Sequence, residues 1–144
     1  MLKDMFERQA SLNARIGYDT KALRDNFDAT TAGQWLNDYI IAAGSELEEL
    51  RDCTYWKHWC TEAKDGKRFT IHDLQNARVE VIDLLFFWIS MAQCLGLNAD
   101  DVYELYLQKL NVNHQRQDGD YSMKSKDEAD NKAISLGRAG GKDL

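Results

Sequence analysis

Residues 79–91 read VEVIDLLFFWISM, and this run decides the fold class. The run is apolar almost all round, which is typical of a helix buried on every side. We therefore predict a helix over residues 71–95, with Gly96 well placed as its C-cap. The chain contains no proline, and without proline long helices run uninterrupted. The sequence thus favours an all-α protein.

Three further segments show apolar residues every three or four positions, and each predicts a helix. They span residues 2–16, residues 31–52 and residues 99–115. Thr30 or Thr31 is a plausible N-cap for the second of these, and Asn98 for the third. Four amphipathic helices with short links predict a four-helix-bundle core. We expect this domain to cover residues 1–121, followed by a loose polar C-terminal tail over residues 122–144.

Composition narrows the class of protein. A length of 144 residues suits one domain, and a formal net charge of -6 argues against a nucleic-acid-binding surface. The apolar run near residues 81–97 is broken by Asp83 and Gln93 and is short for a membrane span. The three cysteines have no framework spacing, which suggests a reducing compartment. We expect a cytoplasmic protein that binds neither nucleic acid nor membrane.

Two pairs of acidic residues carry the candidate chemistry. Glu46 and Glu49 lie three positions apart on one predicted helix, and Glu80 and Asp83 lie three apart on another. Residues at this spacing project from the same helix face. The second pair is embedded in the most apolar helix, where an unpartnered carboxylate is costly. Four oxygen ligands without histidine or cysteine suit Mg²⁺, or Mn²⁺, rather than zinc.

The alternative to a metal site is a network of ion pairs. In that interpretation Glu80 and Asp83 pair with Arg78, Arg51 or lysine residues, and the first acidic pair forms a solvated face. Few basic residues are near Glu80 and Asp83 in the sequence, which favours the metal site. Glu48 points away from the other carboxylates and is interpreted as a solvated residue.

These motifs resemble the all-α nucleoside triphosphate pyrophosphatases (the MazG-like superfamily), and among them the dimeric dUTPases. E-x-x-E on one helix and E-x-x-D on the next is the metal motif of that superfamily, matched by the two acidic pairs. Residues 9–13 resemble the dUTPase motif Q-x-x-L-N, and residues 56–59 resemble W-K-x-W. Residues 106–121 resemble Y-x-x-K-N-x-x-N-x-x-R-Q-x-x-G-Y, with departures at Leu110 and Asp120.

The resemblance implies a hydrolase that cleaves a nucleoside triphosphate to the monophosphate and pyrophosphate. It implies that Glu46, Glu49, Glu80 and Asp83 hold two or more Mg²⁺ ions, with Glu49 also orienting the attacking water. Lys109, Arg116 and Asn113 would contact the phosphates or sugar, and Trp56 or Trp59 would stack on the base. The implied substrate-binding set is Gln9, Asn13, Trp56, Trp59, Lys109, Asn113, Arg116 and Tyr121.

The substrate and the assembly follow from the same resemblance. Only the Q-x-x-L-N match selects uracil, so dUTP is the expected substrate. The departure at Leu110 keeps open dCTP, a purine dNTP or several nucleotides. A non-enzymatic helical interaction protein is a third interpretation. The apolar helix stripes, together with the family's mode of association, predict a homodimer or a larger assembly.

Overall fold

A computed structural model of the chain describes residues 1–118, 131 and 133–136. Within these residues every regular element is helical, and the prediction of an all-α fold is confirmed. Strand-like pairing there is limited to an isolated bridge between Thr54 and Ile71. The chain divides into two compact units, Met1–Leu97 and Asn98–Leu144. Each unit is described by itself.

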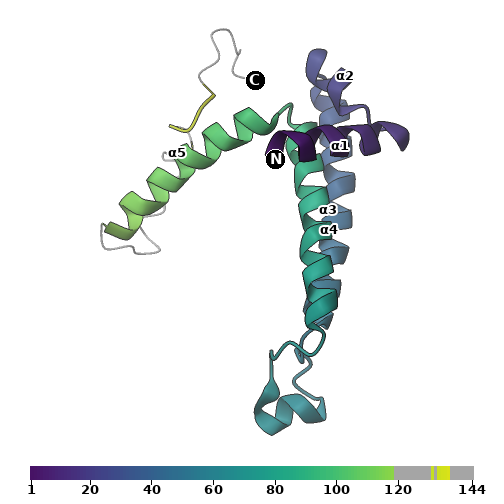
Figure 1. Ribbon diagram of the computed structural model, residues 1–144, viewed down its shortest axis with the longest axis vertical. Coiled ribbons are helices and arrows are strands. Elements are labelled where there is room, and N and C mark those ends of the chain that lie inside the picture. The colour runs from purple at the N-terminus through teal and green to yellow at the C-terminus, as the bar shows by residue number, and fades with distance from the viewer. Residues whose placement is uncertain (119–130, 132, 137–144) are drawn as a thin grey trace. The chain divides into compact units, whose positions relative to one another are not determined.

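The first unit is built on two long helices that lie side by side, α3 (Ala29–Asp52) and α4 (Leu74–Cys94). Helices α1 (Leu2–Arg15) and α2 (Thr20–Asp25) pack against α4 near its C-terminal end (Figure 1). Small side chains fill much of the core between these helices, which lets the backbones approach closely. The buried apolar residues of the helical core are Phe6, Ala10, Leu23, Ala32, Tyr39, Ala43, Ala77, Ile89, Ala92 and Cys94.

The ends of the long helices are set by side-chain caps. Asp28, rather than the predicted Thr30 or Thr31, caps α3, because its carboxylate accepts from the backbone N–H of Thr31 at 2.8 Å. Asp73 caps α4 in the same way, so that helix begins three residues later than predicted. Gly96, predicted as the C-cap of α4, directly follows the cap residue Leu95 and adopts the left-handed backbone that favours glycine, with a φ of 74°.

Two short elements were not predicted. Helix α2 is a single capped stretch of six residues, with Asp19 accepting from Ala22 N at 3.0 Å. The short element η1 (Ala63–Lys67) lies in the connection between α3 and α4, and non-helical backbone angles at Asp65 and Gly66 interrupt it. Both are too short for their apolar residues to show a helical period, so the polar composition of these stretches predicted loops.

The second unit contains α5 (Ala99–Asp118), which begins where Asn98 Oδ1 accepts from the backbone N–H groups of Asp100 and Asp101, both at 2.9 Å. The predicted cap at Asn98 is therefore confirmed. The expected domain boundary at residue 121 lies outside the described residues. Among the described residues, no single helix is long and apolar enough to cross a membrane; only α4 and α5 counted together reach that length and composition.

Candidate metal and nucleotide site

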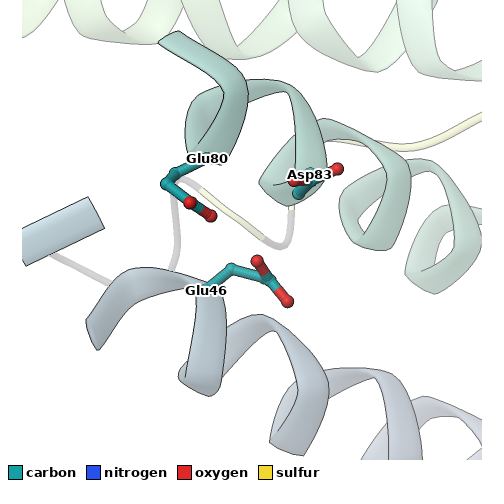
Figure 2. A group of neighbouring side chains, drawn as sticks. All are labelled: Glu46, Glu80 and Asp83. Carbon is teal, nitrogen blue, oxygen red and sulfur yellow. The ribbon is translucent and has the colours of Figure 1, made fainter. Parts of the chain in front are cut away.

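Three of the four predicted metal ligands come together between α3 and α4. Each of Glu46, Glu80 and Asp83 offers a carboxylate oxygen, and these oxygens lie within 4.8 Å of one another. Figure 2 shows Glu46 on α3 facing Glu80 and Asp83 on α4. Glu80 is buried, and the other two are half-buried. The spacing of three along α4 puts its two carboxylates on the face that meets α3.

The three carboxylates repel one another. Partial burial, followed by the charge of Glu49, raises the pKa of Glu46 above its ordinary value, and Glu80 and Asp83 raise it further. Within the described residues no ion pair joins any of the three to a lysine or arginine. Arg51, one of the partners considered above, pairs with Glu48 instead.

This donor set fits a divalent cation. Hard carboxylate oxygens a few ångströms apart are the ligands that Mg²⁺ and Mn²⁺ prefer, and such a cation would neutralise the carboxylate charges that, after burial, raise the Glu46 pKa. Glu49 lies outside the cluster. It is exposed and lines a separate cavity with Asp52 and His72.

A groove of about 340 Å³ extends from the acidic cluster toward α1. Its walls come from α1, α3 and α4, and they include Gln9, Asn13, Tyr39, Glu46 and Asp83. Tyr39 and Glu46 are seven residues apart on α3, so about 10 Å separates the two ends of the groove. One end is acidic, and the other carries amide and hydroxyl groups. This polarity and this volume suit a small ligand with two different ends.

The amide end of the groove rests on a buried network of polar side chains. Gln9 Nε2 donates to Asn13 Oδ1 at 2.9 Å and to Ser90 Oγ at 3.1 Å. Asn13 Nδ2 donates to Ser90 Oγ at 3.1 Å and to Gln93 Oε1 at 3.2 Å. Gln93 Nε2 in turn donates to the backbone carbonyl of Phe6 at 2.7 Å. Gln9 and Asn13 were predicted from the sequence as base contacts, and the structure puts both beside the groove.

The two predicted tryptophans lie in the connection between α3 and α4. Trp56 and Trp59 pack edge to face, with ring centroids 5.9 Å apart. Trp56 Nε1 donates to Asp52 Oδ1 at 2.5 Å, and the guanidinium of Arg51 lies 4.0 Å from the Trp56 ring centroid. Neither tryptophan lines the groove described above.

The predicted phosphate contacts belong to the second unit. Lys109, Asn113 and Arg116 lie on α5. Lys109 Nζ donates to Asn131 Oδ1 at 2.6 Å. Next to it, Gln108 makes two hydrogen bonds to the backbone of Ser135, at 2.8 and 3.1 Å. Tyr121 lies outside the described residues.

Comparison with known proteins agrees with this geometry. Residues 1–94, which carry the three clustered carboxylates and the polar network, match the dUTPase family. The chain belongs to the dUTPase family. It is therefore a nucleotide-hydrolysing enzyme of the diphosphatase type. It is also 28% identical, over 141 residues, to a dCTP pyrophosphatase of Enterobacteria phage LZ5, an alignment that covers 83% of this chain and 82% of that protein. No solved structure matches the chain.

Four polar residues beside the site were missed as functional candidates. Tyr39, Thr20, Ser90 and Gln93 are all buried, and none was predicted as part of the site. Gln93 was interpreted only as an interruption of an apolar run. The available signal was the spacing: Ser90 lies seven residues after Asp83, and Gln93 follows Ser90 by three, so all three share one stripe of α4.

Proposed function

We propose that this dUTPase-family protein hydrolyses dUTP to dUMP and pyrophosphate, with Mg²⁺ held by Glu46, Glu80 and Asp83. The observation that carries the proposal is the groove itself. Two of the three clustered carboxylates, Glu46 and Asp83, and the amide side chains of Gln9 and Asn13 lie at opposite ends of one space of about 340 Å³. A nucleotide has the same polarity, because its phosphates need cations and its base needs directional hydrogen bonds.

In the proposed reaction the protein binds and orients the substrate. Bound Mg²⁺ supplies charge neutralisation of the phosphates and a water of lowered pKa. Glu46, Glu80 and Asp83 hold the cation, while Gln9, whose amide is oriented by Asn13, contacts the base at the other end of the groove. Glu49 lies three residues from Glu46 and is exposed, so its carboxylate is available to orient or deprotonate the attacking water.

The sequence resemblance assigns the phosphate contacts to residues of α5, and we propose this role for Lys109 and Arg116. Lys109 and Arg116 carry positive charge, and arginine can bind a phosphate through two parallel hydrogen bonds. Asn113 lies four residues after Lys109, on the same face of α5, and we propose that it contacts the sugar or a phosphate. The resemblance implies that Trp56 or Trp59 stacks on the base, but both lie in the connection beyond the C-terminal end of α3 and neither lines the groove, so this proposal gives them no contact with the base held at Gln9. We propose that Tyr121 completes the phosphate contacts.

A second candidate substrate is dCTP. The phage relative is a dCTP pyrophosphatase, and its alignment extends over more than four-fifths of both chains. Uracil and cytosine differ in the hydrogen-bonding edge that Gln9 and Asn13 would contact, and the metal chemistry is the same for both. Purine dNTPs remain in the substrate panel as a further alternative.

The test is pyrophosphate release from dUTP, dCTP, dTTP, dATP and dGTP in the presence of Mg²⁺. We expect a pyrimidine nucleotide to be cleaved to its monophosphate, and Glu80→Gln to abolish the reaction. Glu48→Gln is the matched control, because Glu48 lies on α3 but pairs with Arg51 away from the cluster. Wild-type protein that releases no pyrophosphate from any of the five nucleotides would overturn the proposal.

We also propose that the protein forms a homodimer or a larger homo-oligomer through α3 and α4. Large apolar side chains are exposed along both helices at helical spacing, which is more apolar surface than a lone helix pair normally shows to water. They are Ile40, Ile41, Leu47, Val79, Val81, Ile82 and Phe86. Light scattering tests the proposal: we expect at least twice the mass of one chain, and Ile41→Lys should lower it. A monomer mass for the wild type would contradict the proposal.

A further inference from the structure

In the polar network behind the groove, each amide side chain can adopt only one of its two orientations, and the backbone carbonyl of Phe6 determines which one. The backbone carbonyl of Phe6 can only accept a hydrogen bond, so Gln93 must turn its Nε2 toward that carbonyl. Gln93 Oε1 then faces Asn13 and Thr20, and it accepts from Asn13 Nδ2 at 3.2 Å and from Thr20 Oγ1 at 3.3 Å. The orientation of the first amide is thereby fixed by the main chain.

The same orientation passes to the next two amides. Because Asn13 Nδ2 donates to Gln93, Asn13 Oδ1 faces Gln9. Gln9 must therefore donate to that oxygen with its Nε2, at 2.9 Å. Ser90 does not set this order, because a hydroxyl can donate or accept. Ser90 Oγ accepts from the amide N–H groups of Gln9 and Asn13, and the Ser90 hydroxyl donates to Phe86 O at 2.9 Å. Ser90 Oγ also lies 3.4 Å from Asn13 Oδ1.

The network therefore ends in a single free acceptor. Gln9 is 5% exposed, both of its N–H bonds are used inside the protein, and its Oε1 is buried with no hydrogen-bond partner. Buried polar atoms normally have partners, so an orphan beside a ligand-sized groove points to a ligand atom as the missing partner. An acceptor of this kind takes an N–H donor and repels a carbonyl oxygen.

Tyr39 provides a second orphan beside the same groove. Its side chain is 6% exposed, and its hydroxyl is buried without a hydrogen-bond partner. Ser90 is near enough to interact with the hydroxyl but already donates to Phe86 O and accepts from two amides. Leu12 and Ile16, which also line the groove, are 46% and 61% exposed, so side chains at its rim have room to turn when a ligand enters.

We propose that Gln93 is a specificity-determining positioning residue, which locks Gln9 as a hydrogen-bond acceptor, and that the Tyr39 hydroxyl is the second contact to the base. The ligand edge is a donor next to an acceptor on a pyrimidine, with the donor on Gln9 Oε1 and the acceptor on the Tyr39 hydroxyl. This inference rests on the proposed function, because it assumes that the groove takes a nucleotide.

A locked acceptor discriminates between cytosine and uracil. Cytosine carries an amino donor at position 4 and an acceptor at N3, whereas uracil carries an acceptor at position 4 and a donor at N3. Wherever Gln9 meets this edge, one base offers a donor and the other an acceptor. A site that fixes the amide therefore favours one base over the other, whereas an amide that is free to rotate by 180° accommodates both.

The experiment compares kcat/KM for dCTP and dUTP, with Mg²⁺, in the wild type and in Gln93→Met. Methionine has a similar length but cannot hold Asn13 in one orientation. We expect the wild type to favour one base about tenfold or more, and Gln93→Met to bring the ratio at least fivefold closer to one while kcat on the favoured base stays within about fivefold. Thr20→Val is the matched control: it removes another buried bond to Gln93 but leaves the order of the amides intact, and its ratio should equal that of the wild type.

Tyr39→Phe carries the test if Gln93→Met does not fold. We expect it to raise KM for the favoured base about tenfold with little change in kcat, and its melting temperature without nucleotide should not fall below that of the wild type. Any one of four results would overturn the inference alone. They are an active wild type with no base preference, an unchanged ratio of kcat/KM in folded Gln93→Met, an equal change of that ratio in Thr20→Val, and an unchanged KM in Tyr39→Phe. Wild type that cleaves no triphosphate would instead overturn the proposed function on which the inference stands.

Discussion

Replacing Tyr39 by phenylalanine removes one oxygen atom and leaves the ring in place. The ring packs against Tyr18 and Phe87, with centroids 5.3 and 6.2 Å away, and these contacts do not involve the hydroxyl. The hydroxyl is buried without a hydrogen-bond partner. An unpaired buried polar group costs about 1–3 kcal/mol, and the proximity of Ser90 offsets part of that cost.

We therefore expect Tyr39→Phe to be more stable than the wild type in the absence of nucleotide. A gain of about 1 kcal/mol in the free energy of unfolding corresponds to a rise of about 4 °C in melting temperature for a chain of this size. The same variant should bind nucleotide more weakly. A stability gain combined with a binding loss is the signature of a polar group that is kept for a ligand rather than for the fold.

Differential scanning calorimetry without nucleotide measures this effect, and Tyr18→Phe is the matched control. The Tyr18 hydroxyl donates to Asp38 Oδ2 at 2.8 Å, so its removal breaks a hydrogen bond and should lower the melting temperature. The two variants lose the same atom, and we expect shifts of opposite sign. If Tyr39→Phe is destabilised as Tyr18→Phe is, the hydroxyl is paired within the protein and the reasoning is refuted.

The remaining predictions concern the metal ligands and the cysteines. Mg²⁺ at about one hundred times its dissociation constant should raise the free energy of unfolding of the wild type by about 2.7 kcal/mol. Glu80→Gln should lose this stabilisation, and Glu48→Gln should keep it. An equal stabilisation in all three proteins would contradict the assignment of Glu80 as a metal ligand. Cys60 is half-buried, whereas Cys53 and Cys94 are buried, so iodoacetamide at pH 8 should modify Cys60 first and the other two only on unfolding; early modification of Cys94, seen by mass spectrometry, would contradict this burial. Burial, with a smaller effect of Asp38, raises the pKa of the Cys94 thiol from 9.0 to about 11. The unfolded thiol then loses its proton first, so stability to urea should fall as the pH rises from about 9 to about 11, and it should fall less in Cys94→Ala.

The long helices were predictable because their signals are local. The apolar run at residues 79–91 identified α4, and the left-handed Gly96 and the cap at Asn98 followed from residue type alone. The start of α3 was placed too late, because Asp28 competes with Thr30 and Thr31 as a cap and only the backbone path decides between them. Helix α2 is held by a cap and by packing on α4, which no short sequence pattern reports.

The sequence indicated the four candidate carboxylates, but it could not show which of them meet in the folded protein. Spacing along each helix indicated which carboxylates share a face, whereas the rotation of α3 relative to α4 decides which of them meet. Glu46 joins Glu80 and Asp83, and Glu49 stays outside the cluster. The polar network was less accessible still, because the direction of the amides depends on the carbonyl of Phe6, and a main-chain atom has no signature in the sequence.

The central claim is that one groove holds both ends of a nucleotide, and a crystal structure with Mn²⁺ and an α,β-imido analogue of dUTP or dCTP tests it most directly. The imido bridge resists cleavage, and Mn²⁺ is located by its anomalous scattering. We predict Mn²⁺ among the carboxylates of Glu46, Glu80 and Asp83, and the base edge within hydrogen-bond distance of Gln9 Oε1 and the Tyr39 hydroxyl. Metal bound elsewhere, or a base that leaves both of those atoms without a partner, would contradict the account.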